Sequence, residues 1–183
     1  KIMELRRIAV IKRSSNYKEV KDLMKRAFPK NERMPMWLLN YWAKKDGYEF
    51  WSYYDGEDFC GICFAVINKK TVFIWYLAVN DKMRCCGYGS AILNDVKEKY
   101  AGCEITLNVE PLYTTADNYE QRVKRIAFYA RNGCLNTEKI IKFKKDDFLV
   151  LSTKKYFDDV TYKEILRKLS FGLFKPNFTQ ENK

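Results

Sequence analysis

The chain has 183 residues, of which 47% are hydrophobic and 16% aromatic, and its net charge is +11. This length and composition predict one packed globular domain. The sequence contains no histidine, which excludes a Ser–His–Asp triad, a Cys–His nucleophile and every zinc site that needs a histidine ligand. Any general base must therefore be a carboxylate, a tyrosine, a lysine or a relayed water.

The positive charge favours an anionic partner, such as a phosphorylated coenzyme or a nucleic acid. Many of the lysines are scattered singly, however, which is typical of an ordinary soluble surface. No apolar run approaches the length of a membrane span, and the N-terminus lacks the apolar core of a signal peptide. We therefore expect a cytoplasmic protein with six reduced cysteines and no membrane partner.

Hydrophobic periodicity predicts the following elements in chain order. Alternation predicts a first strand over Met3–Ile11, and helical spacing predicts helices over Tyr17–Ala27 and from Pro35 to about Lys44. The remaining predicted elements are strands at Tyr48–Tyr54, Phe59–Ile67 and Thr71–Val79, a helix at Tyr88–Tyr100, a strand at Glu104–Val109, a helix at Tyr119–Arg131, and strands at Leu135–Lys144 and Asp147–Thr153.

This order predicts an α/β (α+β mixed) fold, with a mixed central sheet and helices on both of its faces. We expect residues 1–153 to form the main domain and residues 154–183 to form a C-terminal extension. Thr161-x-x-Glu164 reads as a capping box at the start of a short helix in that extension. The tail from about Pro176 is expected to fray.

The most informative stretch begins with the almost continuously apolar strand that ends at Val79. It continues as a short basic loop and a glycine-rich helix start, Arg84-x-x-Gly87-x-Gly89. Glycine lets the backbone come close to a ligand, and a helix start offers unpaired N–H groups and a positive dipole end. Together with the charge of Arg84, this arrangement predicts a phosphate-binding loop.

The same residues resemble the pyrophosphate-binding signature of the GNAT acetyltransferases (Gcn5-related N-acetyltransferases), which use acetyl-coenzyme A (acetyl-CoA). A second stretch, from Ala127 to Cys134, resembles the late helix of that family, which carries a tyrosine and ends in glycine. The resemblance covers roughly Met3–Ser152 and is specific at these two places. It implies a GNAT-like acyl-CoA N-acyltransferase fold, in which the central sheet is splayed in the middle.

The resemblance also implies which residues hold the cosubstrate. The backbone of Leu77, Ala78 and Val79 would pair with the pantetheine arm, and the N–H of Val79 would polarise the thioester carbonyl. The pyrophosphate cradle would comprise Arg84, Cys85, Cys86, Gly87, Tyr88, Gly89 and Ser90. The family habit is a basic residue or glycine just before the first glycine, so Cys85 and Cys86 depart from it. Arg122 would contact the coenzyme phosphates in place of the family's asparagine, or it is simply exposed.

For the chemistry, Tyr129 matches the family tyrosine that protonates the departing thiolate, and its alternative is a core tyrosine. Glu110 follows a predicted strand and is a candidate base with a raised pKa, or else a solvated loop residue. Glu32 and Trp37 are candidates for the acceptor side, although a turn glutamate and a core aromatic are the alternatives. The base is thus left open between Glu110, Glu32 and a water relay.

Cys60-Gly-Ile-Cys63 lies inside an apolar strand pattern, so we predict buried small side chains there and no metal site.

The sequence as a whole predicts an acetyl-CoA-dependent N-acetyltransferase, a monomer or homodimer, that acts on a primary amine of a small molecule or peptide. Two alternatives remain: a basic nucleic-acid-binding α/β module, and a catalytically inactive CoA-binding sensor of GNAT fold.

Overall fold

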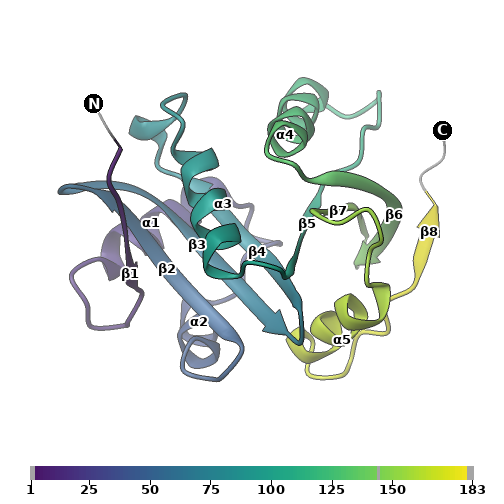
Figure 1. The fold of residues 1–183 in the computed structure, drawn as a ribbon, viewed down its shortest axis with the longest axis horizontal. Coiled ribbons are helices and arrows are strands. Elements are labelled where there is room, and N and C mark those ends of the chain that lie inside the picture. The colour runs from purple at the N-terminus through teal and green to yellow at the C-terminus, as the bar shows by residue number, and fades with distance from the viewer. Residues whose placement is uncertain (1–2, 144, 181–183) are drawn as a thin grey trace. The chain divides into compact units, whose positions relative to one another are not determined.

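A computed structural model describes residues 3–143 and 145–180 (Figure 1). The described residues form two compact units, which share the long central strand β4 (Thr71–Val79). Unit 1 spans residues 3–66 and 75–101, and unit 2 spans residues 67–74 and 102–180. Along the backbone ladders the strands follow the order β1-β2-β3-β4-β5-β7-β6-β8, which makes a mixed eight-stranded sheet and confirms the predicted mixed α/β class.

Unit 1 is an antiparallel meander with helices packed against it. Its elements are β1 (Leu5–Ala9), α1 (Tyr17–Ala27), α2 (Met36–Trp42), β2 (Tyr48–Asp55), most of β3 (Asp58–Asn68), the second half of β4, a 3-10 turn η1 (Asp81–Met83) and α3 (Tyr88–Lys99). The apolar stripe of α1 buries Val20, Leu23 and Met24, as its helical spacing predicts. In Figure 1, α3 lies in front of the strands of this unit and α1 behind them.

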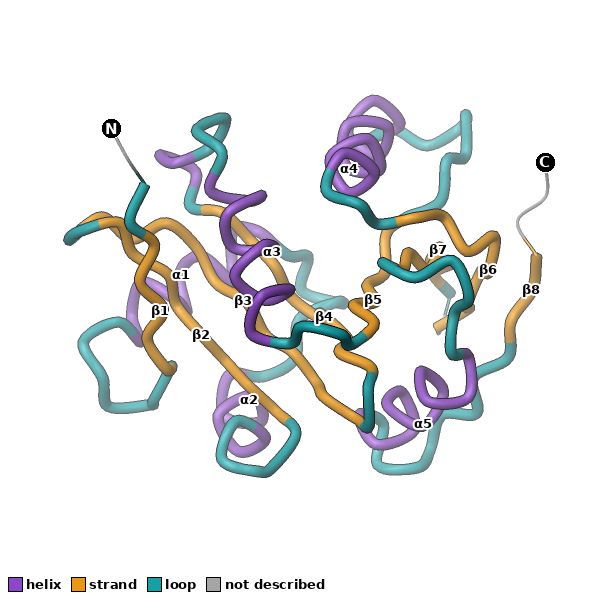
Figure 2. Tube along the Cα trace, in the orientation of Figure 1, coloured by secondary structure: helices purple, strands orange, loops and turns teal. Residues whose placement is uncertain are grey.

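Unit 2 contains the remaining strands and two helices, as Figure 2 shows by element type. Its elements are the first half of β4, β5 (Glu104–Val109), α4 (Tyr119–Arg131), β6 (Leu135–Phe143), β7 (Asp146–Ser152), α5 (Asp159–Leu169) and β8 (Phe178–Gln180). Strand β5 runs parallel to the first half of β4, from Thr71↔Glu104 to Ile74↔Leu107, and antiparallel to β7. The bounds of β4, β5 and α4 equal the predicted ones, whereas the predicted end of β6 at Lys144 lies outside the described residues.

Helix α5 forms in the C-terminal extension as predicted and belongs to unit 2, but its start differs from the prediction. The side chain of Asp158 accepts a hydrogen bond from the Thr161 backbone N–H (3.0 Å), so Asp158 is the cap and Thr161 lies inside the helix. An aspartate caps a helix at least as well as a threonine, so the helix begins earlier. The carboxylate of Glu164 instead accepts hydrogen bonds from the side chains of Asn68 and Lys69.

The predicted fraying from Pro176 is wrong for the residues up to Gln180. Strand β8 pairs with β6, from Ile141↔Phe178 to Lys139↔Gln180. The ring of Phe178 packs 5.9 Å from the ring of buried Tyr162 on α5. One apolar anchor and a strand edge therefore order this short segment, which composition alone did not indicate.

Gly61 marks a tight backbone approach in unit 1. A Cβ atom at Gly61 would lie 2.4 Å from the carbonyl oxygen of Ala78 on β4 and 2.9 Å from Cδ1 of Ile92 on α3. The first of these neighbours is backbone, which cannot rotate away as a side chain can. Glycine is therefore required where β3, the end of β4 and α3 meet.

We predict that Gly61→Ala destabilises the protein by about 2–3 kcal/mol or more, because overpacking a tight core displaces backbone. The matched control is Gly102→Ala, where a Cβ would meet no atom within 4 Å but φ is +83°. That control isolates the cost of a left-handed backbone, about 1 kcal/mol. Chemical denaturation of both variants checks the difference, and equal losses would contradict the described approach.

Candidate functional site

The end of β4 is fixed by Asn80. Its backbone N–H donates to the carbonyl of Cys60 (2.8 Å), and its side-chain amide donates to the carbonyl of Phe59 (2.9 Å). These two bonds join the residue after β4 to β3. The three residues predicted to pair with pantetheine, Leu77–Val79, directly precede this clamp, and Ala78 among them is buried. The strand and the two bonds after it thus fix the backbone of these three residues, independently of their side chains.

The loop from Arg84 to Gly87 leads into α3 through two left-handed residues. Cys85 has φ of 61° and Gly87 has φ of 85°, and such values favour glycine and strain a cysteine. Gly87 is the N-cap of α3, and no side chain caps the helix there. The first intrahelical bond described runs from the Ala91 N–H to the Gly87 carbonyl (3.1 Å).

The N–H groups of the first turn therefore belong to the set that a helix cannot satisfy internally. Cys85, Cys86 and Gly87 are exposed, and Gly89 and Ser90 are half-buried, so the loop and the helix start face solvent. Uncapped first-turn N–H groups at the positive end of a helix dipole suit a phosphate. The residues predicted for the pyrophosphate cradle lie together here, and their contact with a diphosphate stays a prediction.

Two arginines gather at this loop through one carboxylate. Arg84 contacts Asp81 Oδ1 at 2.7 Å, and Arg26, from the last turn of α1, donates to Asp81 Oδ2 at 2.8 Å. The hydrogen bond from Arg26 lowers the pKa of Asp81, and the charge of Arg84 adds to this effect. The cluster keeps a net positive charge beside the helix start. Arg26 was missed from sequence, because a basic residue ending a helix gives no sign of a partner 55 residues later.

Tyr88 anchors the first turn of α3. Its hydroxyl donates to Oδ2 of Asp55 (2.7 Å), a buried aspartate at the end of β2. This hydrogen bond, with burial, raises the pKa of Tyr88 to about 12. The tyrosine side chain is therefore bonded within unit 1 and holds the helix start in place, while its N–H belongs to the uncapped first turn.

In unit 2, Glu110 follows β5 and is held by two arginines. Its carboxylate contacts Arg122 at 2.9 Å and Arg125 at 2.7 Å, and the Asn118 amide donates to both of its oxygens at 3.2 Å. Burial alone would raise the pKa of Glu110, but the hydrogen bonds from Asn118 and Arg125 and the two positive charges outweigh burial. The pKa of Glu110 is lowered, and the predicted raised pKa is wrong.

Arg122 has several partners within unit 2 besides Glu110. Its Nε donates to Oδ1 of Asn118 (2.7 Å) and its Nη1 donates to the carbonyl of Pro111 (2.8 Å), and 15% of its side chain is exposed. These bonds tie the start of α4 to the segment after β5. The role of Arg122 at the coenzyme phosphates stays a prediction.

Tyr129 lies in the last turns of α4 and is 9% exposed. Its carbonyl accepts from the backbone N–H of Cys134 (2.9 Å), beyond the chain reversal at Gly133, and its ring packs 5.0 Å from that of Phe128. Both the helix end and the neighbouring ring fix the position of Tyr129. This burial suits a positioned acid and also a core residue, so its catalytic role stays a prediction.

The predicted acceptor-side residues lie in unit 1, in and after the segment between α1 and α2. The hydroxyl of Tyr76 on β4 donates to the carbonyl of Glu32 (2.7 Å) and accepts from the N–H of Met34 (3.1 Å). Burial raises the pKa of Tyr76 to about 12. Trp37, at the start of α2, is 66% exposed, so it is not the core aromatic that its spacing allowed. The Glu32 backbone is thus fixed to the central strand.

Cys60 and Cys63 are fully buried in β3, which confirms the interpretation of this pair as small apolar side chains. Among residues 3–143 and 145–180, no group of three or more acidic or cysteine side chains is placed to hold a metal ion. None of the helices in that part of the chain has the length and apolarity to cross a bilayer.

Comparisons with known proteins place these observations in context. Residues 17–133 match the model of the acetyltransferase (GNAT) family. No curated protein sequence matches the chain significantly. Among solved structures, a protein from Bacteroides thetaiotaomicron, described as a GNAT-family acetyltransferase, has a TM-score of 0.73 at 19% identity and covers 92% of this chain and 99% of its own.

Two further structures carry coenzyme groups. Arabidopsis thaliana Naa50, in complex with the bisubstrate analogue CoA-Ac-MVNAL, has a TM-score of 0.59 at 26% identity, covering 83% of this chain and 99% of its own. A Bacillus subtilis acetyltransferase in complex with CoA has a TM-score of 0.59 at 16% identity, covering 84% of this chain and 100% of its own. These similarities confirm the predicted fold and the predicted family resemblance.

The contacts of Glu110 generate a prediction about pH. Because its pKa is lowered in the folded protein, its contribution to the free energy of unfolding is fully present above the pKa of an unfolded glutamate, about 4.3. This contribution is lost as the pH falls through the lower folded pKa. Glu110→Gln should therefore be less stable than wild type near neutral pH, and the difference should narrow below about pH 4.

Denaturant unfolding at several pH values measures this difference. The control is Glu57→Gln, which changes an exposed glutamate in the turn between β2 and β3 and should shift stability little at any pH. A difference between wild type and Glu110→Gln that stays constant across the acid range would contradict the lowered pKa.

Proposed function

Because the chain belongs to the acetyltransferase (GNAT) family, we propose that it transfers an acetyl group from acetyl-CoA directly to a primary amine. The observation that carries the proposal is the uncapped first turn of α3, which follows the exposed loop from Arg84 to Gly87 after the central strand. The coenzyme complexes of the Bacillus subtilis and Arabidopsis proteins support it. Transfer would occur in a ternary complex without an acyl-enzyme, consistent with the lack of a histidine-activated nucleophile.

Acetyl-CoA would supply the activated thioester, and residues of unit 1 would bind it. The diphosphate would accept hydrogen bonds from N–H groups between Cys85 and Ser90, while Arg84 would add charge. Arg26 would act indirectly, since its bond to Asp81 limits how far that carboxylate can pull Arg84 from the phosphates. In the GNAT arrangement, the backbone of Leu77–Val79 would pair with pantetheine. The N–H of Val79 would then stabilise the negative charge that develops on the thioester oxygen.

Proton transfer would use a different set of groups. Tyr129 would protonate the departing thiolate, a role that needs a fixed hydroxyl. The incoming amine must lose a proton, and a carboxylate with a lowered pKa is a weak base near neutral pH. The arginine contacts of Glu110 therefore favour Glu32 or a relayed water as the base. Glu110 would then position Arg122 and the start of α4.

The acceptor would be a primary amine on a small molecule or a peptide. Glu32 carries the negative charge that attracts an ammonium group, and the exposed ring of Trp37 lies five residues further on. The acceptor in the Arabidopsis Naa50 complex is part of a peptide analogue. Pentapeptides with a free N-terminal amine therefore belong in an acceptor screen beside small amines. Release of the free CoA thiol reports turnover with any of them.

Once an accepted amine is known, the variant Tyr129→Phe tests the proposed role of Tyr129 as the general acid. The change removes one oxygen and keeps the ring, so packing and acetyl-CoA affinity should hardly change. We expect turnover to fall by about 10²–10⁴-fold, the usual contribution of a general acid. The decrease should appear in kcat at saturating acetyl-CoA, because the interaction is made mainly in the transition state.

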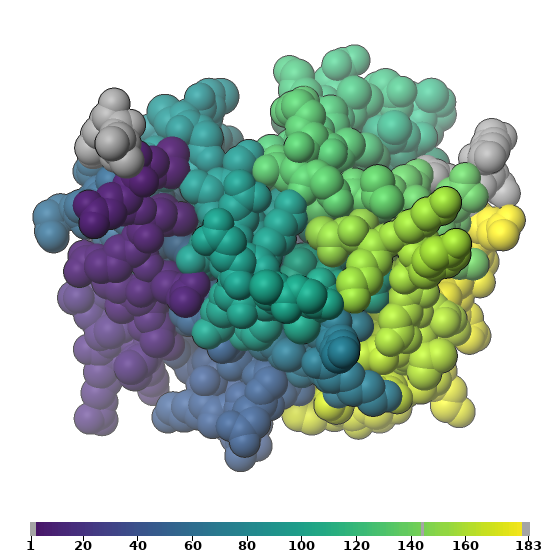
Figure 3. Space-filling view, viewed as in Figure 1, coloured from purple at the N-terminus to yellow at the C-terminus, as the bar shows by residue number. Residues whose placement is uncertain are grey.

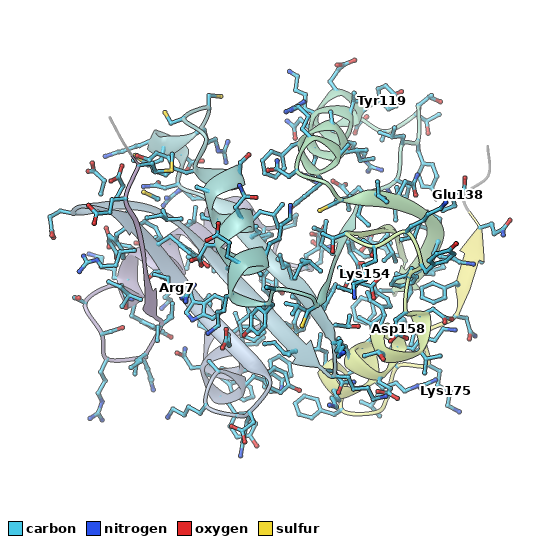
Figure 4. All side chains as sticks on the ribbon, viewed as in Figure 1. Arg7, Tyr119, Glu138, Lys154, Asp158 and Lys175 are labelled. Carbon is cyan, nitrogen blue, oxygen red and sulfur yellow. The ribbon has the colours of Figure 1, made fainter. Side chains whose placement is uncertain are left out.

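The control is Tyr119→Phe at the start of the same helix, which should keep wild-type turnover (Figure 4). Wild-type turnover in Tyr129→Phe would remove Tyr129 from the mechanism. Binding of acetyl-CoA by the wild type without release of thiol, across the whole screen, would favour the CoA-binding sensor over the enzyme.

A further inference from the structure

The segment after α5 presents large apolar side chains to solvent at the tip of a closed turn. Leu173 is 89% exposed and Phe171 is 63% exposed. Figure 3 shows that the chain from α5 onward, in yellow-green to yellow, reaches the surface of unit 2. Side chains of this size are normally buried, so two of them within three residues are an unusual feature of a water-facing turn.

This turn is a defined structure. The N–H of Gly172 donates to the Arg167 carbonyl (2.7 Å), and the N–H of Phe174 donates to the Ser170 hydroxyl (3.0 Å). Phe171 has φ of 53° and Gly172 has φ of 81°, so two successive residues are left-handed. This conformation is strained for a phenylalanine. The fold therefore holds the ring of Phe171 outward at a conformational cost, although an asparagine or glycine would fit that backbone better.

Next to these exposed side chains lies the half-buried Phe174. The ring of Phe174 packs 5.1 Å from the ring of Phe143, at the end of β6, in an edge-to-face arrangement. Phe143 is itself exposed. We define the apolar tip as Phe143, Phe171, Leu173 and Phe174. It is thus built from two segments of unit 2, which contact each other through the rings of Phe143 and Phe174.

Beside Phe143 the sequence carries Asp146 and Asp147 together with lysines, whereas only positive charge flanks the other three residues of the tip. Between Ile165 and Gln180 the chain carries Arg167, Lys168 and Lys175 and no acidic residue. All three cations are exposed, and Figure 4 labels Lys175 after α5. Exposed apolar side chains with exposed cations next to them in the sequence match an anionic bilayer, in which apolar side chains enter the acyl boundary while cations stay among the headgroups.

We propose that the apolar tip and its flanking cations form a docking site for an anionic lipid surface. This departs from the expectation that the protein has no membrane partner, and it is independent of the acetyl-transfer proposal. Docking would be peripheral and reversible, because two inserted side chains and three charges give only weak binding. A protein surface is a less suitable partner, since it would need a pocket for each exposed side chain, whereas a bilayer accepts them without one.

Vesicle co-flotation of the whole chain tests this proposal. The probes are phosphatidylcholine vesicles with and without phosphatidylserine, at low salt. The wild type should float with the anionic vesicles and bind the neutral ones at least about tenfold more weakly. The double variant Phe171→Asn with Leu173→Gln should lower binding to anionic vesicles by about tenfold or more. Because asparagine suits the left-handed backbone at 171, this variant should fold.

The matched control is Ile11→Asn, which removes an apolar side chain of similar exposure (57%) from unit 1 and should bind like wild type. A charge variant, Arg167→Gln with Lys175→Gln, should weaken binding by about fivefold per removed cation. Circular dichroism verifies folding of each variant.

Failure of the wild type to float with anionic vesicles would overturn the proposal. So would undiminished binding of the Phe171→Asn, Leu173→Gln variant, since the overall charge of +11 would then suffice. An equal loss in Ile11→Asn would also overturn it, because the binding would not depend on the tip.

Discussion

The backbone of Gly61 on β3 closely approaches the Ala78 carbonyl, one residue before the central strand ends in unit 1. Asn80 then joins the chain to β3 through two hydrogen bonds, and Tyr88 fixes the start of α3 to Asp55. Between these two points the chain has only a few residues in which to turn, and it does so through left-handed backbone at Cys85 and Gly87. The exposed loop and the uncapped helix start that follows it lie between these constraints.

Charge organises the two units in different ways. In unit 1, Asp81 gathers Arg84 and Arg26, so a net positive cluster lies beside N–H groups that suit an anion. In unit 2, Arg122 and Arg125 gather on Glu110 and keep it ionised. An ionised, arginine-bound carboxylate is a good positioning group and a weak base. The chemistry proposed for the amine therefore depends on Glu32 or water.

Sequence patterns predicted some of this architecture closely. The bounds of β4, β5 and α4 were correct because each element combines a clear apolar pattern with glycine, proline or asparagine at its ends. Contacts between distant residues could not be predicted in this way. The anchoring of β8 by Phe178 and the pairing of Glu110 with its arginines each need a partner that local sequence does not identify. The cap at Asp158 is a local contact, and it was missed because Thr161 three residues later also begins a capping-box pattern.

Cofactor binding at the start of α3 is the central claim, and an added negative charge there tests it most directly. Gly89→Asp places a carboxylate in the first helical turn, where the helix itself tolerates acid, and Asn94→Asp adds the same charge later on α3. Wild type and Asn94→Asp should gain thermal stability with acetyl-CoA, by about 2.7 kcal/mol at 100 times Kd, and Gly89→Asp should gain almost none. An equal gain in all three proteins would contradict the account.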